Sequence, residues 1–163
     1  MIRVRLQLNG DKEPKYTDTE HGLIYVASDD RFDAPIKPFE KTTYPEQEGE
    51  NIYNKTVSDA FDCKVVWFIK ADRSEVDGSL DNANVIISRF NSLLYTQEGD
   101  VKSFNRVTFY NDYKKVKIVG IPSPISEATE FWRDASGKQH DVVMVEWTIR
   151  VDKPSLCDFN YSE

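Results

Sequence analysis

Apolar and polar residues alternate along several stretches of the chain, and this alternation predicts strands. In residues 2–8 every second side chain is apolar, and Arg3 and Arg5 lie on the opposite, polar face. Near the other end, residues 125–133 and 139–151 predict a pair of strands joined by a turn rich in Asp, Ser and Gly. The alternation is clearest in the second of these arms, which we expect to be a half-buried strand.

Other stretches have the composition of strands without strict alternation. Residues 23–27 form a short apolar run, which predicts a strand buried on both faces. Residues 61–71 are rich in β-branched and aromatic side chains, as a central strand would be. Strand composition returns in residues 104–110 and 116–121, until two prolines force a break.

One amphipathic helix is predicted, at about residues 79–96. Ser79 is a good N-cap, and Asp81 lies in the first turn, where the helix dipole favours an acid. Apolar residues recur there at three- and four-residue steps, and they are Leu80, Ala83, Ile86, Ile87, Phe90, Leu93 and Leu94. The outer side is expected to carry mainly Asn82, Asn84, Ser88, Arg89 and Asn91.

A long proline-containing loop is expected at about residues 31–59. Its prolines and glycine are spaced so that neither a long helix nor a long strand fits, and a loop of that length tends to be functional or to order on assembly. Its aromatic residues either anchor the loop to another surface or cap this chain's own core. These residues are Phe32, Phe39, Tyr44 and Tyr53.

The order of these elements defines the fold class. About three strands, one helix and about four more strands do not produce the alternating units of a parallel sheet. We therefore predict an α+β, mainly β fold, an antiparallel β-sandwich or open barrel flanked by the helix. The 163 residues are expected to form a single domain.

The charge balance excludes some classes of function. With 28 acidic and 21 basic residues, the formal net charge is −7, which argues against sequence-specific nucleic-acid binding and against binding to anionic membranes. An acidic wall still allows DNA to pass without holding it. The N-terminal residues do not resemble a signal peptide, and the apolar runs are too short for a membrane span, so we expect a cytoplasmic protein.

No catalytic or metal-binding pattern is found in the sequence. Cys63 and Cys157 are far apart and are expected to be free thiols, although one disulfide is the alternative. His21 and His140 fall at predicted turns or strand edges. A phosphate loop, a nucleophile elbow and paired Cys-x-x-Cys motifs are missing. We therefore expect a protein that is not an enzyme and that has no cofactor.

Aromatic residues offer the main alternative. Trp67 and Trp147 lie within apolar strands and are expected in the core, whereas Phe131 and Trp132 lie at the edge of a turn. That pair is our candidate for an exposed aromatic contact, although it could also be core. Together with the tyrosines at positions 110 and 113 it could form a stacking platform for a carbohydrate or another small molecule.

The order of strands, one amphipathic helix and further strands resembles the tail-tube fold. Phage tail-tube and distal-tail subunits share this fold with the tube protein of type VI secretion. Residues 44–52, followed by 61–65, look like the stretch near the start of distal-tail-like proteins, where a loop with a glycine introduces a central strand. The helix, residues 104–107 and the last hairpin extend the resemblance over about two thirds of the chain.

The resemblance implies a structural subunit of a phage or prophage tail, cytoplasmic during assembly. Its subunits would pair their sheets edge to edge into a homo-oligomeric ring, which is hexameric in that family, and would contact neighbouring tail proteins in the virion. The implied interface residues are Arg3, Arg5, Tyr44, Glu48, Glu50 and Ile52. Larger distal-tail proteins carry a second, carbohydrate-binding-like domain, for which we expect no room here.

Overall fold

The chain is built mainly of strands. The computed structural model describes all residues except 1, 30–40, 43–50, 53–58, 72–79 and 162–163, and for residues 41–42 and 51–52 it describes the backbone only. The strands are β1 (Arg5–Gln7), β2 (Lys15–Tyr16), β3 (Ile24–Ser28), β4 (Lys41–Thr42), β5 (Asn51–Ile52), β6 (Phe61–Lys70), β7 (Tyr95–Glu98), β8 (Val101–Phe104), β9 (Val107–Asn111), β10 (Val116–Pro122) and β11 (Val142–Val151). The helices are α1 (Thr17–Glu20), α2 (Asp81–Ser92) and the 3-10 turn η1 (Pro154–Leu156).

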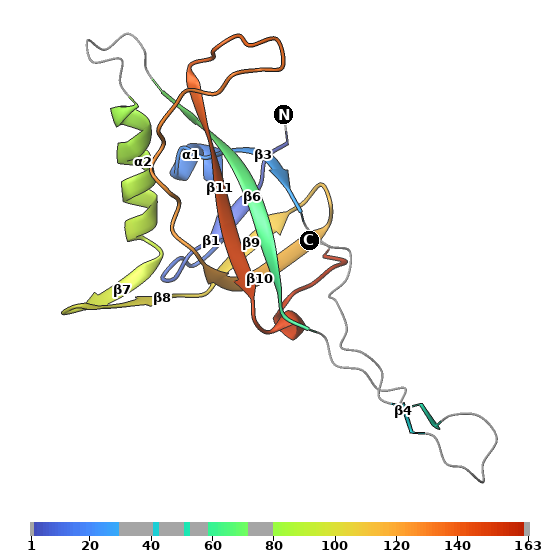
Figure 1. The fold of residues 1–163 in the computed structure, drawn as a ribbon. Coiled ribbons are helices and arrows are strands. Elements are labelled where there is room, and N and C mark those ends of the chain that lie inside the picture. The colour runs from blue at the N-terminus through green and yellow to red at the C-terminus, as the bar shows by residue number, and fades with distance from the viewer. Residues whose placement is uncertain (1, 30–40, 43–50, 53–58, 72–79, 162–163) are drawn as a thin grey trace.

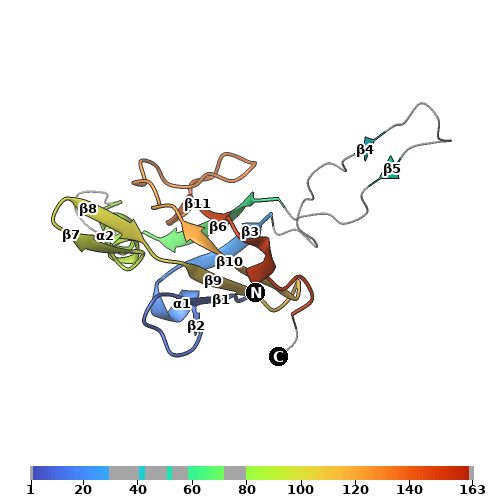
Figure 2. The ribbon, with the colours of Figure 1, turned by 90° about the horizontal axis from the view of Figure 1, so that it is seen from below.

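Seven strands form one antiparallel sheet in the order β2-β1-β9-β10-β11-β6-β3 (Figures 1 and 2). Two small ladders stand apart from it, β4 with β5 and β7 with β8. In Figure 1 the β7–β8 ladder projects beyond the lower end of α2. The predicted α+β, mainly β class is confirmed.

Strand β10 changes its partner at Gly120, and the sheet turns a corner there. Val116 to Gly120 pair with β9, whereas Ile121 and Pro122 pair with β11. A β-carbon at Gly120 would overlap the carbonyl oxygen of Arg150 and lie 2.7 Å from Ile149 Cγ2. Only glycine permits so close a crossing of two backbones.

Because of this corner, the two halves of the sheet face each other across an aromatic core. The ring centres of Trp67 on β6 and Phe109 on β9 lie 6.3 Å apart. The ring centre of Tyr25 on β3 lies 6.4 Å from that of Phe109. Helix α2 covers an open side, with Phe90 5.3 Å from Trp147. Such aromatic side chains bury large apolar areas, which makes them the main source of hydrophobic stabilisation here.

The two longest strands agree with the sequence pattern. The alternation in β11 buries Val143, Val145, Trp147, Ile149 and Val151. Strand β6 pairs on one side with β11 and on the other with β3, as expected of a central strand.

Two other strand predictions are partly wrong. The alternation of residues 2–8 buries the even positions from 4 to 8, but Ile2 is 40% exposed. Residues 23–27 are predicted to be buried on both faces, yet Val26 is 39% exposed and Ala27 is also exposed. The reason is topological, because β3 is the last strand of the sheet and its register with β6 shifts at Val26.

Helix α2 is shorter than predicted. It ends at Ser92, Leu93 is 45% exposed instead of buried, and Tyr95 already begins β7. Gly99 adopts a positive φ of 58° in the two-residue connection between β7 and β8, so a hairpin replaces the last predicted helical turn. The proposed N-cap, Ser79, lies outside the described residues.

Residues 125–133, expected to be a strand, run instead along α2 (Figure 1). The Asn91 side chain accepts from the N–H of Ile125 and donates to its carbonyl, both at 2.8 Å. Asn84 binds Ala128 in the same way, accepting at 2.9 Å and donating at 3.3 Å. These two asparagines, predicted on the outer side of the helix, thus take the place of a neighbouring strand.

Replacing Gly120 by alanine tests the corner. Gly120→Ala is expected to lower the free energy of unfolding by about 1–3 kcal/mol, because the added methyl group overlaps the backbone of β11. Gly137→Ala is the control, because that glycine has φ +85° and open space around it, so its cost of about 1–2 kcal/mol is purely conformational.

Urea denaturation measures both variants. An aromatic near-UV circular dichroism spectrum that changes in Gly120→Ala and not in Gly137→Ala would show that the core itself has shifted. Unchanged stability of Gly120→Ala would contradict the proposed close crossing.

Candidate functional site

The two arginines of the predicted interface bind acidic residues within this chain. Arg3 donates to both carboxylate oxygens of Asp18, at 2.8 and 2.9 Å, and its guanidinium lies 4.0 Å from the centre of the Tyr16 ring. This hydrogen bonding lowers the pKa of the Asp18 carboxyl below its usual value. Arg3 therefore holds β1 against the β2–α1 connection, at an exposed position.

Arg5 forms a more buried clamp. Its guanidinium donates to both oxygens of Asp112, at 3.0 and 2.8 Å, and lies 5.1 Å from the centre of the Tyr110 ring. Its side chain is 14% exposed, and one nitrogen also reaches the Tyr161 hydroxyl at 3.4 Å. The clamp joins β1, the β9–β10 turn and the C-terminal segment.

The remaining interface candidates have less structural description. Tyr44, Glu48 and Glu50 lie outside the described residues, and for Ile52 only the backbone is described. Ile52 belongs to β5 and pairs with Lys41 of β4. This ladder falls in a stretch where the sequence predicts only a loop.

The aromatic pair Phe131 and Trp132 is half-buried. Trp132 packs against Phe68 on β6 and against His140, with ring centres 4.9 Å apart in both cases. Phe131 packs against the core. Both residues, together with the exposed Met144, line a surface hollow of about 280 Å³. The pair thus lies at the edge of the core and borders open surface.

The loop after this pair is held by Asp134. Its carboxylate accepts hydrogen bonds from the backbone N–H groups of Ser136 and Lys138, and it pairs with His140 Nε2 at 2.8 Å. The His140 and Ser136 hydrogen bonds keep the pKa of Asp134 well below its usual range. This arrangement is structural, because each of these contacts serves to close the loop.

The other histidine, His21, is half-buried against Phe90, with ring centres 5.5 Å apart. Burial lowers its pKa below the usual histidine value. No third histidine, cysteine or carboxylate joins either histidine in a group that could hold a metal ion, within the described part of the chain. Cys63 and Cys157 form no disulfide, as expected.

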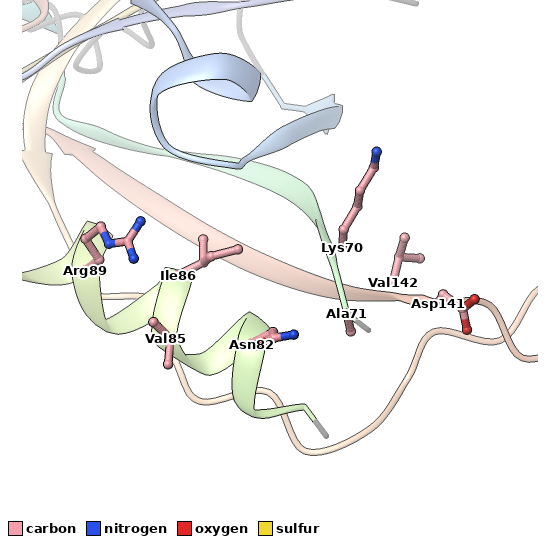
Figure 3. Close-up of a pocket in the computed structure, with 8 residues that line it drawn as sticks. All are labelled: Lys70, Ala71, Asn82, Val85, Ile86, Arg89, Asp141 and Val142. Atoms are coloured by element: carbon pink, nitrogen blue, oxygen red, sulfur yellow. The ribbon is translucent and has the colours of Figure 1, made fainter. Parts of the chain in front are cut away.

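A surface groove lies between α2 and the adjacent ends of β6 and β11 (Figure 3). Its volume is about 780 Å³, and α2 contributes Val85, Ile86 and Arg89 to one wall. Lys70 and Asp141 lie on the opposite wall. The groove is mostly apolar, and its charged groups do not form a nucleophile–base pair or a carboxylate dyad.

The alternative stacking platform is not assembled. Tyr110 is only 8% exposed, and Tyr161 packs against its ring at 5.3 Å, so it offers no open face to a sugar. Tyr113 is 73% exposed, but it lies in the β9–β10 turn, whereas Trp132 packs on Phe68. The four aromatic residues do not line one hollow among those described.

Asn84 and Asn91 are the important residues that the sequence pattern places wrongly. They are seven positions apart, which is about two helical turns, and therefore lie on one flank of α2. That spacing of two amides is the signal by which they could be found.

Among the described residues, no helix is long and apolar enough to span a membrane.

Comparison with known proteins supports the fold. No family model and no curated protein sequence matches this chain. Among solved structures, it is similar to the Dit protein (gp 19.1) of phage SPP1, described as a paradigm of the hub adsorption apparatus in phages that infect Gram-positive hosts. The TM-score is 0.52 at 13% sequence identity, and the match covers 93% of this chain and 50% of Dit. The resemblance to phage tail proteins is thus confirmed at the level of the fold, and this chain spans half the length of Dit.

The Arg5 clamp gives a testable prediction. Arg5→Lys is expected to lower the free energy of unfolding by about 1–2 kcal/mol, because lysine cannot donate two parallel hydrogen bonds to Asp112. The matched control is Arg3→Lys, which should cost less because Arg3 is 41% exposed and solvent screens its ion pair. Chemical denaturation at two salt concentrations measures both, and an equal or larger loss in Arg3→Lys would contradict this ranking.

Proposed function

We propose that the chain is a non-enzymatic structural subunit of a phage or phage-derived tail, which closes into a homo-oligomeric ring of six copies by edge-to-edge sheet pairing. The observation that carries this proposal is the likeness to Dit over 93% of the chain. It concerns only the half of Dit that this chain matches. Neighbouring tail proteins are the other proposed partners, and the virion tail is the proposed location.

The topology of the large sheet supports edge-to-edge pairing. Among the described residues the sheet does not close on itself in hydrogen bonds, because β2 and β3 are its two terminal strands. Strand β3 exposes Val26 and Ala27 along its length. Exposed edges invite pairing with another chain, and a ring satisfies every such edge with an identical neighbour.

The acidic composition also agrees with a tail. A net charge of −7 would give the walls of a ring a negative potential. DNA could slide along such walls without being held, because a negative surface repels phosphate groups.

A lysine on the outer strand tests the pairing. Val26→Lys places a charge on the β3 edge, and because Val26 is already 39% exposed, the folded monomer should be preserved while ring formation weakens by about tenfold or more. Val85→Lys is the control, since Val85 is 55% exposed on α2, which is not part of the sheet.

The measurement is the solution mass by light scattering across a concentration series, followed by negative-stain imaging. Closed rings formed by the unmodified chain and by Val85→Lys, but not by Val26→Lys, would support pairing through β3. A monomer at all concentrations, also when purified tail proteins are added, would refute the ring.

The loop candidates give a second test. Reversing the charges of Glu48 and Glu50 together is expected to weaken the oligomer, because both are proposed to face a neighbouring subunit. The same light-scattering series measures the effect, with reversal of Glu98 and Asp100, exposed in the β7–β8 hairpin, as the control of equal charge. A ring that is unchanged by the first pair would remove the loop from the interface.

A further inference from the structure

Strand β11 has a second edge that is only partly occupied. The even-numbered residues of β11 direct their backbone groups away from β6. At one end Arg150 pairs with Ile121, and Thr148 exchanges hydrogen bonds with Ser123. At the other end the carbonyl of Val142 accepts a hydrogen bond from the N–H of Trp132. Met144 and Glu146 share this direction, because the register with β6 is continuous. Their backbone groups make no hydrogen bond on that side with any described residue.

The gap results from the path of the chain. Ser123 binds Thr148 and Trp132 binds Val142, so the same gap is spanned by two stretches of chain. The stretch from Ser123 to Trp132 advances nine residues, and β11 advances only six from Thr148 to Val142. The first stretch is thus three residues longer than a strand paired with β11 would be. In the register set by Ser123 and Thr148, Ile125 would face Glu146. Its backbone groups instead bind Asn91 of α2, and those of Ala128 bind Asn84.

The two asparagines therefore hold residues 125–128 on the helix and away from the strand. A slot of about 310 Å³ lies between residues 126–130 and the stretch from Met144 to Glu146. At Met144 it adjoins the hollow bordered by Phe131 and Trp132. Met144 itself is 49% exposed, so an apolar contact surface meets the unpaired backbone groups.

The slot has a strong charge bias. Glu127, Glu130 and Glu146 line it, and all three are exposed and form no ion pair with described residues. Arg133, which lines the adjoining hollow, donates to the carbonyl of Gly137. Two copies of this edge facing each other would bring like charges together, which disfavours pairing of the slot with itself.

We propose that this slot accepts an extended segment of a partner protein in which apolar side chains alternate with lysine or arginine. The segment's backbone would pair with Met144 and Glu146 in the short gap between the Ser123–Thr148 and Trp132–Val142 hydrogen bonds, by the main-chain pairing that also adds strands to sheet edges. Because Met144 and Glu146 point to the same face of β11, the cations of the segment would lie on that face, near Glu146. Its apolar side chains would point to the opposite face, toward Ala128 and Val145, which also line the slot. This interaction uses a different edge from the ring proposed above and does not depend on it.

The test uses the full chain and three capped peptides. The probe has the sequence Thr-Lys-Val-Lys-Val-Lys-Thr, the charge control replaces every lysine by glutamate, and the backbone control carries N-methyl groups on its three central residues, which removes their N–H donors. Tryptophan fluorescence follows binding, because the peptides contain no aromatic residue. Amide hydrogen exchange by NMR reports on the N–H groups of Met144 and Glu146, which should become protected only with the first peptide.

Two sets of variants locate the site. Met144→Pro removes an N–H that no described residue uses, and it should weaken binding of the first peptide about five- to tenfold, whereas Met144→Ala keeps the N–H and isolates the side-chain effect. Replacing Glu127, Glu130 and Glu146 by glutamine should weaken binding about tenfold and flatten its salt dependence. The matched control changes three exposed acids elsewhere, namely Glu13 and Glu98 to glutamine and Asp100 to asparagine.

The outcomes separate the proposal from its alternatives. Saturable binding of the lysine peptide alone, with protection of the two amides, supports it. Equal binding of all three peptides, equal weakening by the control acids, or no saturable binding at millimolar peptide overturns it. Should Met144→Pro fail to fold, the amide exchange of the unmodified chain still decides. Light scattering on the same samples shows whether a fluorescence change comes from self-association, which would also count against the proposal.

Discussion

The close crossing of β10 and β11 at Gly120 is the constraint on which the rest of the structure depends. Because no side chain separates Gly120 from the Arg150 carbonyl, one strand can pair with β9 in its first half and with β11 in its second. This exchange turns a flat sheet into two facing layers and creates the enclosed space that Trp67 and Phe109 fill. A larger residue would push the layers apart.

The corner also determines the path of the chain after β10. Once β10 has left β9, only β11 is available as a partner, and β10 can pair with it for a short distance before Pro122 and Pro124 remove two backbone donors. Helix α2 then competes for the emerging segment with the side-chain amides of Asn84 and Asn91. Each asparagine satisfies both a donor and an acceptor of the backbone, so the segment keeps these hydrogen bonds when it follows the helix instead of β11.

The parts of the fold that depend on burial could be predicted from the sequence, whereas those that depend on remote partners could not. The alternation in β11 identifies a strand, because a one-residue change of register would expose every buried side chain. Apolar composition does not reveal that β3 ends the sheet formed by the described residues. Residues 125–133 find their partners in polar side chains of a helix. In the candidate site, Arg3 and Arg5 are recognisable as charged residues on a strand, yet the acids that they bind are remote in sequence.

Three edges of the large sheet, as far as it is described, differ in chemistry. Strands β2 and β3 end the sheet, and in the proposed ring an identical neighbour would extend them. The gap at Met144 is recessed behind residues 126–130 and surrounded by carboxylates, which repel a second copy and attract a basic segment. A subunit that both forms a ring and attaches that ring to another protein needs two kinds of edge. One edge must pair with copies of the same chain, and the other must select a different partner.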